Sequence, residues 1–184
     1  MSLYEFAGTL ITTATDGPAL ANSTVATSLL PSAALYTLPA NYFDIRKKLI
    51  VVAHGRVSNI VTTPGTLTLD VRLGGVIAAN SGAITINTTA KTNVSWVLWW
   101  KLTCRAIGSG TSANLMHQGE WVAESVVSSP AGTAGTFLLP ASAPAVGTGF
   151  DSTSAQPVNL FATWSIANAG NSIQLHGYDL IALN

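Results

Sequence analysis

The feature that most constrains the fold is a strict two-residue alternation from Val94 to Arg105. A period of two places successive side chains on opposite faces of an extended strand. We therefore expect a long strand over 94–107, with one face in the core. The core face is Val94, Trp96, Leu98, Trp100, Leu102 and Cys104, and the opposite face is Ser95, Val97, Trp99, Lys101, Thr103 and Arg105.

Similar patterns predict further strands along the chain. Turn signals rich in Gly, Asn and Pro separate them at intervals of about 8–12 residues, and no segment has helical periodicity. The predicted fold is all-β, an antiparallel β-sandwich with jelly-roll topology and about eight strands. The expected strands are 8–13, 49–58 (buried on both faces), 66–73, 83–88, 94–107, 114–127, 158–166 and 172–183.

The 184 residues are enough for one β domain with a full core. Residues 1–40 are rich in Thr, Ala and Ser and contain three prolines, which predicts an extended N-terminal arm followed by a single sandwich domain over 41–184. Residues 128–153 are rich in Pro, Gly and Ala and are expected to form a long, contact-making loop.

Charge is scarce in this chain. It holds 8 Lys or Arg and 8 Asp or Glu, 9% of all residues, whereas an ordinary soluble domain has about 25%. With 48% hydrophobic residues, there is little charge to keep copies apart, so we expect an assembly. Zero net charge and a pI near 6.8 provide no basic field for nucleic acid or a membrane surface. We expect neither as a partner.

Catalytic motifs are not evident. Residues 108–113 formally match a dinucleotide fingerprint, but a strand pattern follows where that motif needs a helix. Glu120 and Glu124 share a strand face about 13 Å apart, too far for a hydrolytic pair. We expect no enzyme activity, catalytic residue or cofactor. The other carboxylates considered for acid–base chemistry are Asp70, Asp151 and Asp179.

Metal ligands are few. Cys104 is the only cysteine, so it forms no intramolecular disulfide, and we expect it to be buried. His54, His117 and His176 lie in three separate expected strands and could meet at a metal. Three residues from distant strands rarely converge by chance, and each is better explained as a half-buried side chain with a bonded ring nitrogen. We expect no metal site.

Trp99 stands apart from the other tryptophans of its strand. Alternation places Trp96 and Trp100 in the core and Trp99 outside, beside Val97. An outward tryptophan is either a sugar-stacking platform or a contact to another protein subunit, and the neighbouring valine favours the protein contact. The expected interface residues are Val97, Trp99, Phe137, Leu138 and Leu139.

Three stretches carry a family resemblance: VSNIVTTPGTLTLDVRLGG, TNVSWVLWWKLTCRAIGSGTSANLMHQGEW and SIQLHGYDLIALN. The body of the chain resembles the jelly-roll minor virion proteins of tailed bacteriophages, which decorate capsids or form head fibres, often as trimers. The resemblance implies a structural, non-enzymatic protein on the capsid surface of the virion. The N-terminus has Glu5 and Gly8 where a secretory signal needs a basic start and a long apolar core, so we expect no signal peptide and synthesis in the host cytoplasm. Its partners would be its own copies, in a homotrimer, and the major capsid protein.

Two alternatives remain open. A receptor- or glycan-binding head-fibre or tail-fibre domain would share the fold and the trimeric state. A carbohydrate-binding module outside viruses would use the tryptophans to stack on sugar rings. In either case the partner would be a glycan.

Overall fold

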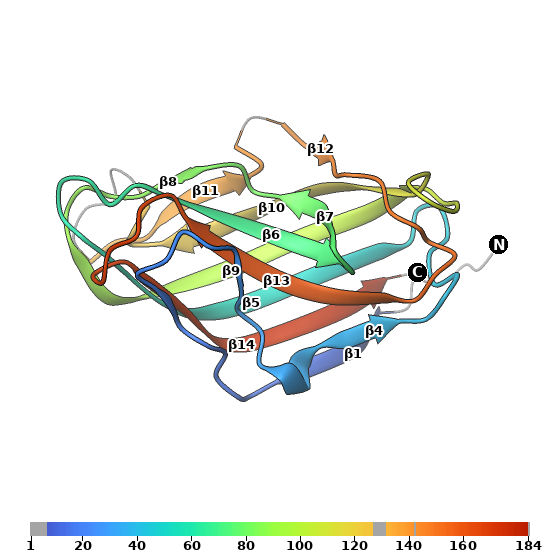
Figure 1. Ribbon diagram of the computed structural model, residues 1–184, viewed down its shortest axis with the longest axis horizontal. Coiled ribbons are helices and arrows are strands. Elements are labelled where there is room, and N and C mark those ends of the chain that lie inside the picture. The colour runs from blue at the N-terminus through green and yellow to red at the C-terminus, as the bar shows by residue number, and fades with distance from the viewer. Residues whose placement is uncertain (1–6, 127–131, 142, 184) are drawn as a thin grey trace.

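Two antiparallel sheets lie face to face in the computed structural model, which describes residues 7–126, 132–141 and 143–183 (Figure 1). The larger sheet has eight strands and the smaller sheet six. This arrangement confirms the predicted antiparallel β-sandwich. Among the described residues, none of the helical structure is long and apolar enough to span a bilayer.

The larger sheet contains the longest strands and holds the candidate site. Its order is β1 (Ala7–Thr13), β14 (Ser172–Leu183), β5 (Lys48–Asn59), β9 (Lys91–Ala106), β10 (Asn114–Ala123) and β11 (Gly135–Leu139). Two short strands extend it, β2 (Leu20–Ala21) against β14 and β12 (Ala145–Val146) against β10.

The smaller sheet covers the opposite side of the core. Its order is β3 (Thr27–Ser28), β13 (Gln156–Trp164), β6 (Thr66–Leu73) and β7 (Val76–Asn80), with β4 (Tyr36–Leu38) on β13 and β8 (Ile84–Thr85) on β6; one 3₁₀ turn spans Ser32–Ala34. Early and late strands are nested, because β14 lies beside β5 in one sheet and β13 beside β6 in the other. A long hairpin rolled up, as in a jelly roll, pairs its strands in this way.

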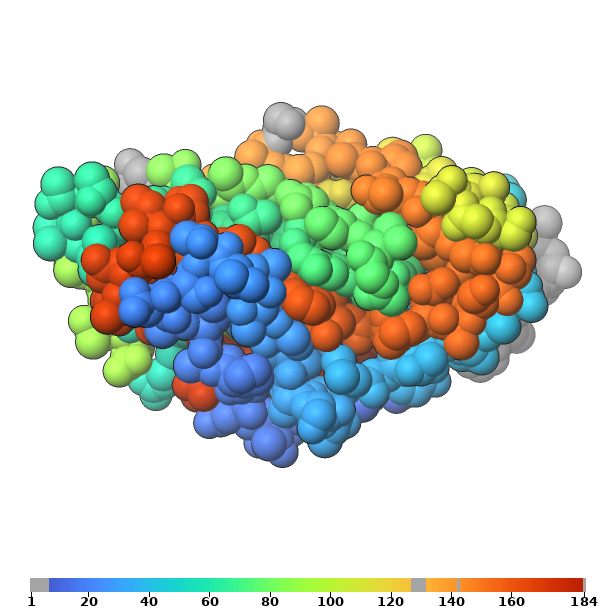
Figure 2. Space-filling view, viewed as in Figure 1, coloured from blue at the N-terminus to red at the C-terminus, as the bar shows by residue number. Residues whose placement is uncertain are grey.

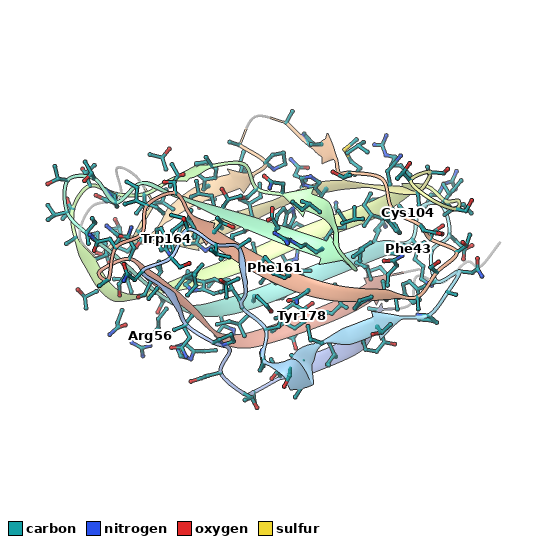
Figure 3. All side chains as sticks on the ribbon, viewed as in Figure 1. Phe43, Arg56, Cys104, Phe161, Trp164 and Tyr178 are labelled. Atoms are coloured by element: carbon teal, nitrogen blue, oxygen red, sulfur yellow. The ribbon has the colours of Figure 1, made fainter. Side chains whose placement is uncertain are left out.

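Tryptophans fill the space between the sheets. The side chains of Trp96, Trp100, Trp121 and Trp164 are fully buried, which confirms the core prediction for the first two. The indole N–H of Trp96 donates to the carbonyl oxygens of Arg56 (3.1 Å) and Gln174 (3.2 Å), so this ring also joins strands of the larger sheet. Figure 3 shows Cys104 and Phe43 towards one end of the sandwich and Trp164 and Arg56 towards the other. Cys104 is buried, as predicted.

The extended arm expected over 1–40 is corrected for the described part. Residues 7–38 supply β1 to β4, which pair with β14 and β13, and Figure 2 shows the early residues, in blue, lying against the body. The strand expected at 8–13 is confirmed as β1. A Cβ at Gly17 would lie 1.8 Å from the carbonyl oxygen of Leu29, so glycine allows the chain to fold tightly onto itself there. Residues 1–6 lie outside the described residues.

Other expected elements differ in detail. β5 is not buried on both faces, because its side chains alternate between the core and an outer face that includes exposed His54 and Arg56. The segment 128–153 contains β11 and β12 instead of one long loop, and its first residues lie outside the described part. The strand expected at 83–88 shortens to β8, and β7 is an additional strand.

Candidate interaction face on the larger sheet

The candidate site is the outer face of the larger sheet, on the side away from the core. The pairings of five strands place one residue from each at neighbouring positions of a single row. With about 4.8 Å between strands, this row runs for about 19 Å. In order from β14 to β11, its members are Asp179, Val52, Trp99, Glu120 and Leu138.

The middle of this face is apolar and open to solvent. Trp99 is 40% exposed, Val97 is 49% exposed and Leu138 is 54% exposed. Charged residues surround this centre, and the Lys101 ammonium lies 6.0 Å from the centroid of the Trp99 ring. At that distance the cation is attracted to the face of the indole. The face therefore combines an aromatic centre with a polar rim.

A shallow depression of about 260 Å³ lies beside the Trp99 ring. Gly119, at a core-facing position of β10, contributes backbone to it, and a Cβ there would lie 2.2 Å from the carbonyl oxygen of Trp99 and 2.7 Å from the Cα of Trp100. The glycine lets β10 approach β9 closely beside the exposed indole. The residues that line the depression are Trp99, Lys101, Gln118, Gly119, Glu120 and Leu138.

Three of the five expected interface residues lie on this face. Val97, Trp99 and Leu138 are exposed there, as strand alternation requires. The expectation for the other two is corrected, because Leu139 is fully buried and Phe137 packs against the core. Alternation along β11 sends Leu138 outward and its two neighbours inward. Gln118 and Glu120 complete the site, and they become its neighbours through the β9–β10 register.

The three histidines do not gather at one point. His117 lies inside the sandwich, with its ring edge-on to Trp100 at 5.6 Å, and burial lowers the pKa of His117. His54 and His176 lie on the outer face, where the Nδ1 atom of His176 is 2.7 Å from a carboxylate oxygen of Asp16. In the part of the chain that the structure describes, no three His, Cys, Asp or Glu side chains are placed to hold a metal ion.

Three of the candidate acid–base carboxylates have hydrogen-bond partners within the fold. Asp70 is buried in the smaller sheet, where it accepts hydrogen bonds from Asn80 and from Arg72 at 3.2 Å. Glu124 accepts from the Lys91 ammonium at 2.7 Å, and that hydrogen bond is the first cause that lowers the pKa of Glu124. Hydrogen bonds from Thr153 lower the pKa of Asp151. These carboxylates stabilise strands and turns.

No protein-family model and no curated protein sequence matches the chain. Among solved structures, the chain is similar to the CBM2 module of the evolved Dit of Lactobacillus casei BL23 phage J-1, with 12% identity, 82% of this chain and 68% of that chain covered, and a TM-score of 0.33.

Two further solved structures are sugar complexes. Winged bean acidic lectin complexed with methyl-α-D-galactose is 7% identical over 98% of this chain and 100% of that chain, with a TM-score of 0.31. Fructofuranosidase from Schwanniomyces occidentalis complexed with fructose is 8% identical over 97% of this chain and 34% of that chain, with a TM-score of 0.28.

Proposed function

We propose that this protein is a structural component of a tailed-phage particle, which decorates and reinforces the capsid exterior as a homotrimer. The observation that carries the proposal is the exposed centre of Val97, Trp99 and Leu138 on the outer face of the larger sheet. The contact would be with other copies of the chain and with the major capsid protein.

The composition of this face supports a protein contact. Interfaces between proteins favour aromatic side chains at the centre and polar side chains at the rim, and a central tryptophan commonly carries much of the binding energy. Here Trp99 has valine and leucine neighbours, while Lys101 and Glu120 lie beside it. A closed symmetric oligomer would remove the apolar centre from water in every copy.

Low charge supports a contact that does not depend on ion pairs. The chain has 9% charged residues, so few pairs are available across an interface. Apolar burial, in contrast, is not screened by salt. Exposed Val146 on β12 lies in the segment 128–153, which we retain as a contact segment for the capsid. Binding to shells should therefore persist at high salt.

Co-sedimentation with purified, undecorated phage capsids tests this function. We expect the full chain to sediment with shells at roughly 0.1 and 1 M salt, and Trp99→Ala to remain in the supernatant. Ile45→Ala is the matched control, because Ile45 is 59% exposed but lies in the turn before β5 and on no strand of this face. Failure of the full chain to sediment, or equal binding by both variants, would contradict the proposal.

A glycan-binding fibre domain is the second candidate function. It is favoured by the depression beside Trp99, where an aromatic face is next to hydrogen-bonding groups of Lys101, Gln118 and Glu120. An apolar wall with a few polar groups is the usual form of a small-molecule site. A glycan array with Trp99→Ala and Gln118→Ala tests it. The glycan-binding function would replace the decoration proposal if the original chain binds a glycan saturably, both substitutions abolish that binding, and the original chain does not sediment with capsids.

A further inference from the structure

A second depression lies on the same outer face, next to an irregularity in β14. It has a volume of about 330 Å³ and is lined by His54, Gly55, Arg56, Ser95 and His176. We propose that it binds an oxyanion, the carboxylate or phosphate group of a ligand, with the Arg56 guanidinium as the principal contact. This site borders the Trp99 surface, because His54 is the cross-strand partner of Val97, but its principal contact Arg56 pairs with Ser95 and the proposal does not depend on the function proposed above.

A β-bulge forms one wall of this depression. Leu175 and Gly177 pair with consecutive residues of β5, which leaves His176 as the extra residue between them. His54 packs on Gly177, where a Cβ would lie 2.2 Å from the Cε1 atom of the imidazole. A side chain at position 177 would displace this ring. Bulges commonly aim side chains in this way.

Arg56 supplies the permanent positive charge. One guanidinium nitrogen donates to the carbonyl oxygen of Asn93 at 3.3 Å, which leaves other N–H donors of the fork for a ligand. Ser95 is the β9 partner of Arg56, so its hydroxyl lies on the same side of the sheet. A guanidinium beside a hydroxyl matches the geometry of a carboxylate or phosphate.

His176 contributes a polar atom that lacks a partner. Asp16 binds its Nδ1 atom at 2.7 Å and thereby orients the ring, whereas its Nε2 atom is buried without a hydrogen-bond partner among the described residues. Because this atom is buried, His176 forms part of the wall of the depression, and the direct contacts to a ligand come from Arg56 and Ser95.

The charges around the depression favour an anion over a cation. Arg56 repels a metal ion, and among the described residues that line the depression none is a carboxylate; Asp16 is engaged by His176. Ser95 and Trp99 are four residues apart on β9, about 13 Å along the strand. A ligand at Arg56 therefore leaves the indole of Trp99 untouched, and the two surfaces can be tested independently.

An NMR titration of the full chain with inorganic phosphate, and separately with acetate, tests the site at low ionic strength. We expect saturable shifts of the amide signals of His54, Arg56 and Ser95. Arg56→Gln should weaken binding by about tenfold or more, since it removes a charge-assisted pair. Tighter binding of one probe than the other identifies whether the natural group is a phosphate or a carboxylate.

Arg105→Gln is the matched control, because Arg105 is exposed on the same face of β9 but at its other end. This variant and Trp99→Ala should bind both probes as the original chain does. Ser95→Ala, a small change on the surface, should weaken binding by a few-fold without affecting the fold. Shifts that do not saturate, or equal affinities of the Arg56 and Arg105 variants, would overturn the proposal.

Discussion

Trp99 and Trp100 are consecutive residues of β9 that lie on opposite faces of the larger sheet. Trp100 is 0% exposed and packs in the core beside His117, whereas Trp99 is 40% exposed on the outer face. Substitution of alanine at each position therefore distinguishes the contribution of β9 to the stability of the fold from its contribution to binding through the outer face.

Trp100→Ala should lower the free energy of unfolding by about 3–5 kcal/mol, because it opens a large cavity in the core. Trp99→Ala should lower it by about 1 kcal/mol or less, since much of that side chain already contacts water. Chemical denaturation of both variants under conditions that keep the chain monomeric measures the difference. Similar losses in the two variants would show that the assignment of the faces is wrong.

His117 should make stability depend on pH. Burial lowers its pKa below the ordinary value of about 6.5. As the pH falls below about 6.5, His117 becomes protonated in the unfolded chain but stays neutral in the folded chain. The free energy of unfolding therefore decreases with falling pH until the pH reaches the lower pKa of His117 in the folded chain. Above about pH 6.5, His117 is neutral in both states and its full contribution to the free energy of unfolding is present. Urea midpoints across this range should show a slope that His117→Gln reduces.

Replacement of exposed His54 by Gln is the control for the pH experiment. His54 lies on the outer face and should leave the slope due to His117 in place. If the chain with His117→Gln loses stability on acidification as steeply as the original chain, another group is responsible.

Gly119→Ala should disturb the hairpin that carries the Trp99 surface. The added methyl would lie 2.2 Å from the carbonyl oxygen of Trp99, so β9 and β10 must move apart. We expect a loss of about 1–3 kcal/mol in unfolding free energy, the usual cost of overpacking. Gly75→Ala is the control, because a Cβ there meets nothing within 4 Å. Equal thermal stability of the two variants would contradict the close approach of the strands.

Asn59→Ala should lower the free energy of unfolding, because Asn59 joins a buried polar cluster at one end of the sandwich. The Asn59 side chain donates to the carbonyl oxygens of Asn87 (2.8 Å) and Thr89 (3.0 Å) and accepts from the Ser125 hydroxyl (2.8 Å). Its removal leaves the buried Ser125 hydroxyl without this acceptor and removes both donated bonds, at a cost of about 1–3 kcal/mol in denaturant unfolding. A loss no greater than that of Asn114→Ala, at a half-buried position on β10, would count against this role.

Local sequence patterns predicted the long central strands well. The bounds expected for 66–73 and 172–183 agree with β6 and β14, because alternation is strong there and glycine- or asparagine-rich turns flank them. The opposite orientations of Trp99 and Trp100 follow from alternation alone. These features depend on neighbours in the chain, which is why they could be predicted.

The same patterns do not predict which strands pair when those strands are far apart in the chain. β1 to β4 are joined to the sheets by β13 and β14, more than a hundred residues later in the chain. The pattern at 8–13 therefore predicted a strand but not its partner, and the composition of the later residues indicated only an extended segment. Likewise, Leu138 and Glu120 become neighbours of Trp99 only through the strand registers. The contact between Asp16 and His176 spans 160 residues and has no local signal.

The surface around Trp99 is the protein contact on which the proposed assembly depends. Light scattering of the purified chain and of Trp99→Ala at micromolar concentration tests it directly. We expect the original chain to have three times the chain mass of 19.0 kDa, and the variant to have the mass of a single chain. A monomeric mass for the original chain, or the same trimer for both proteins, would contradict the account.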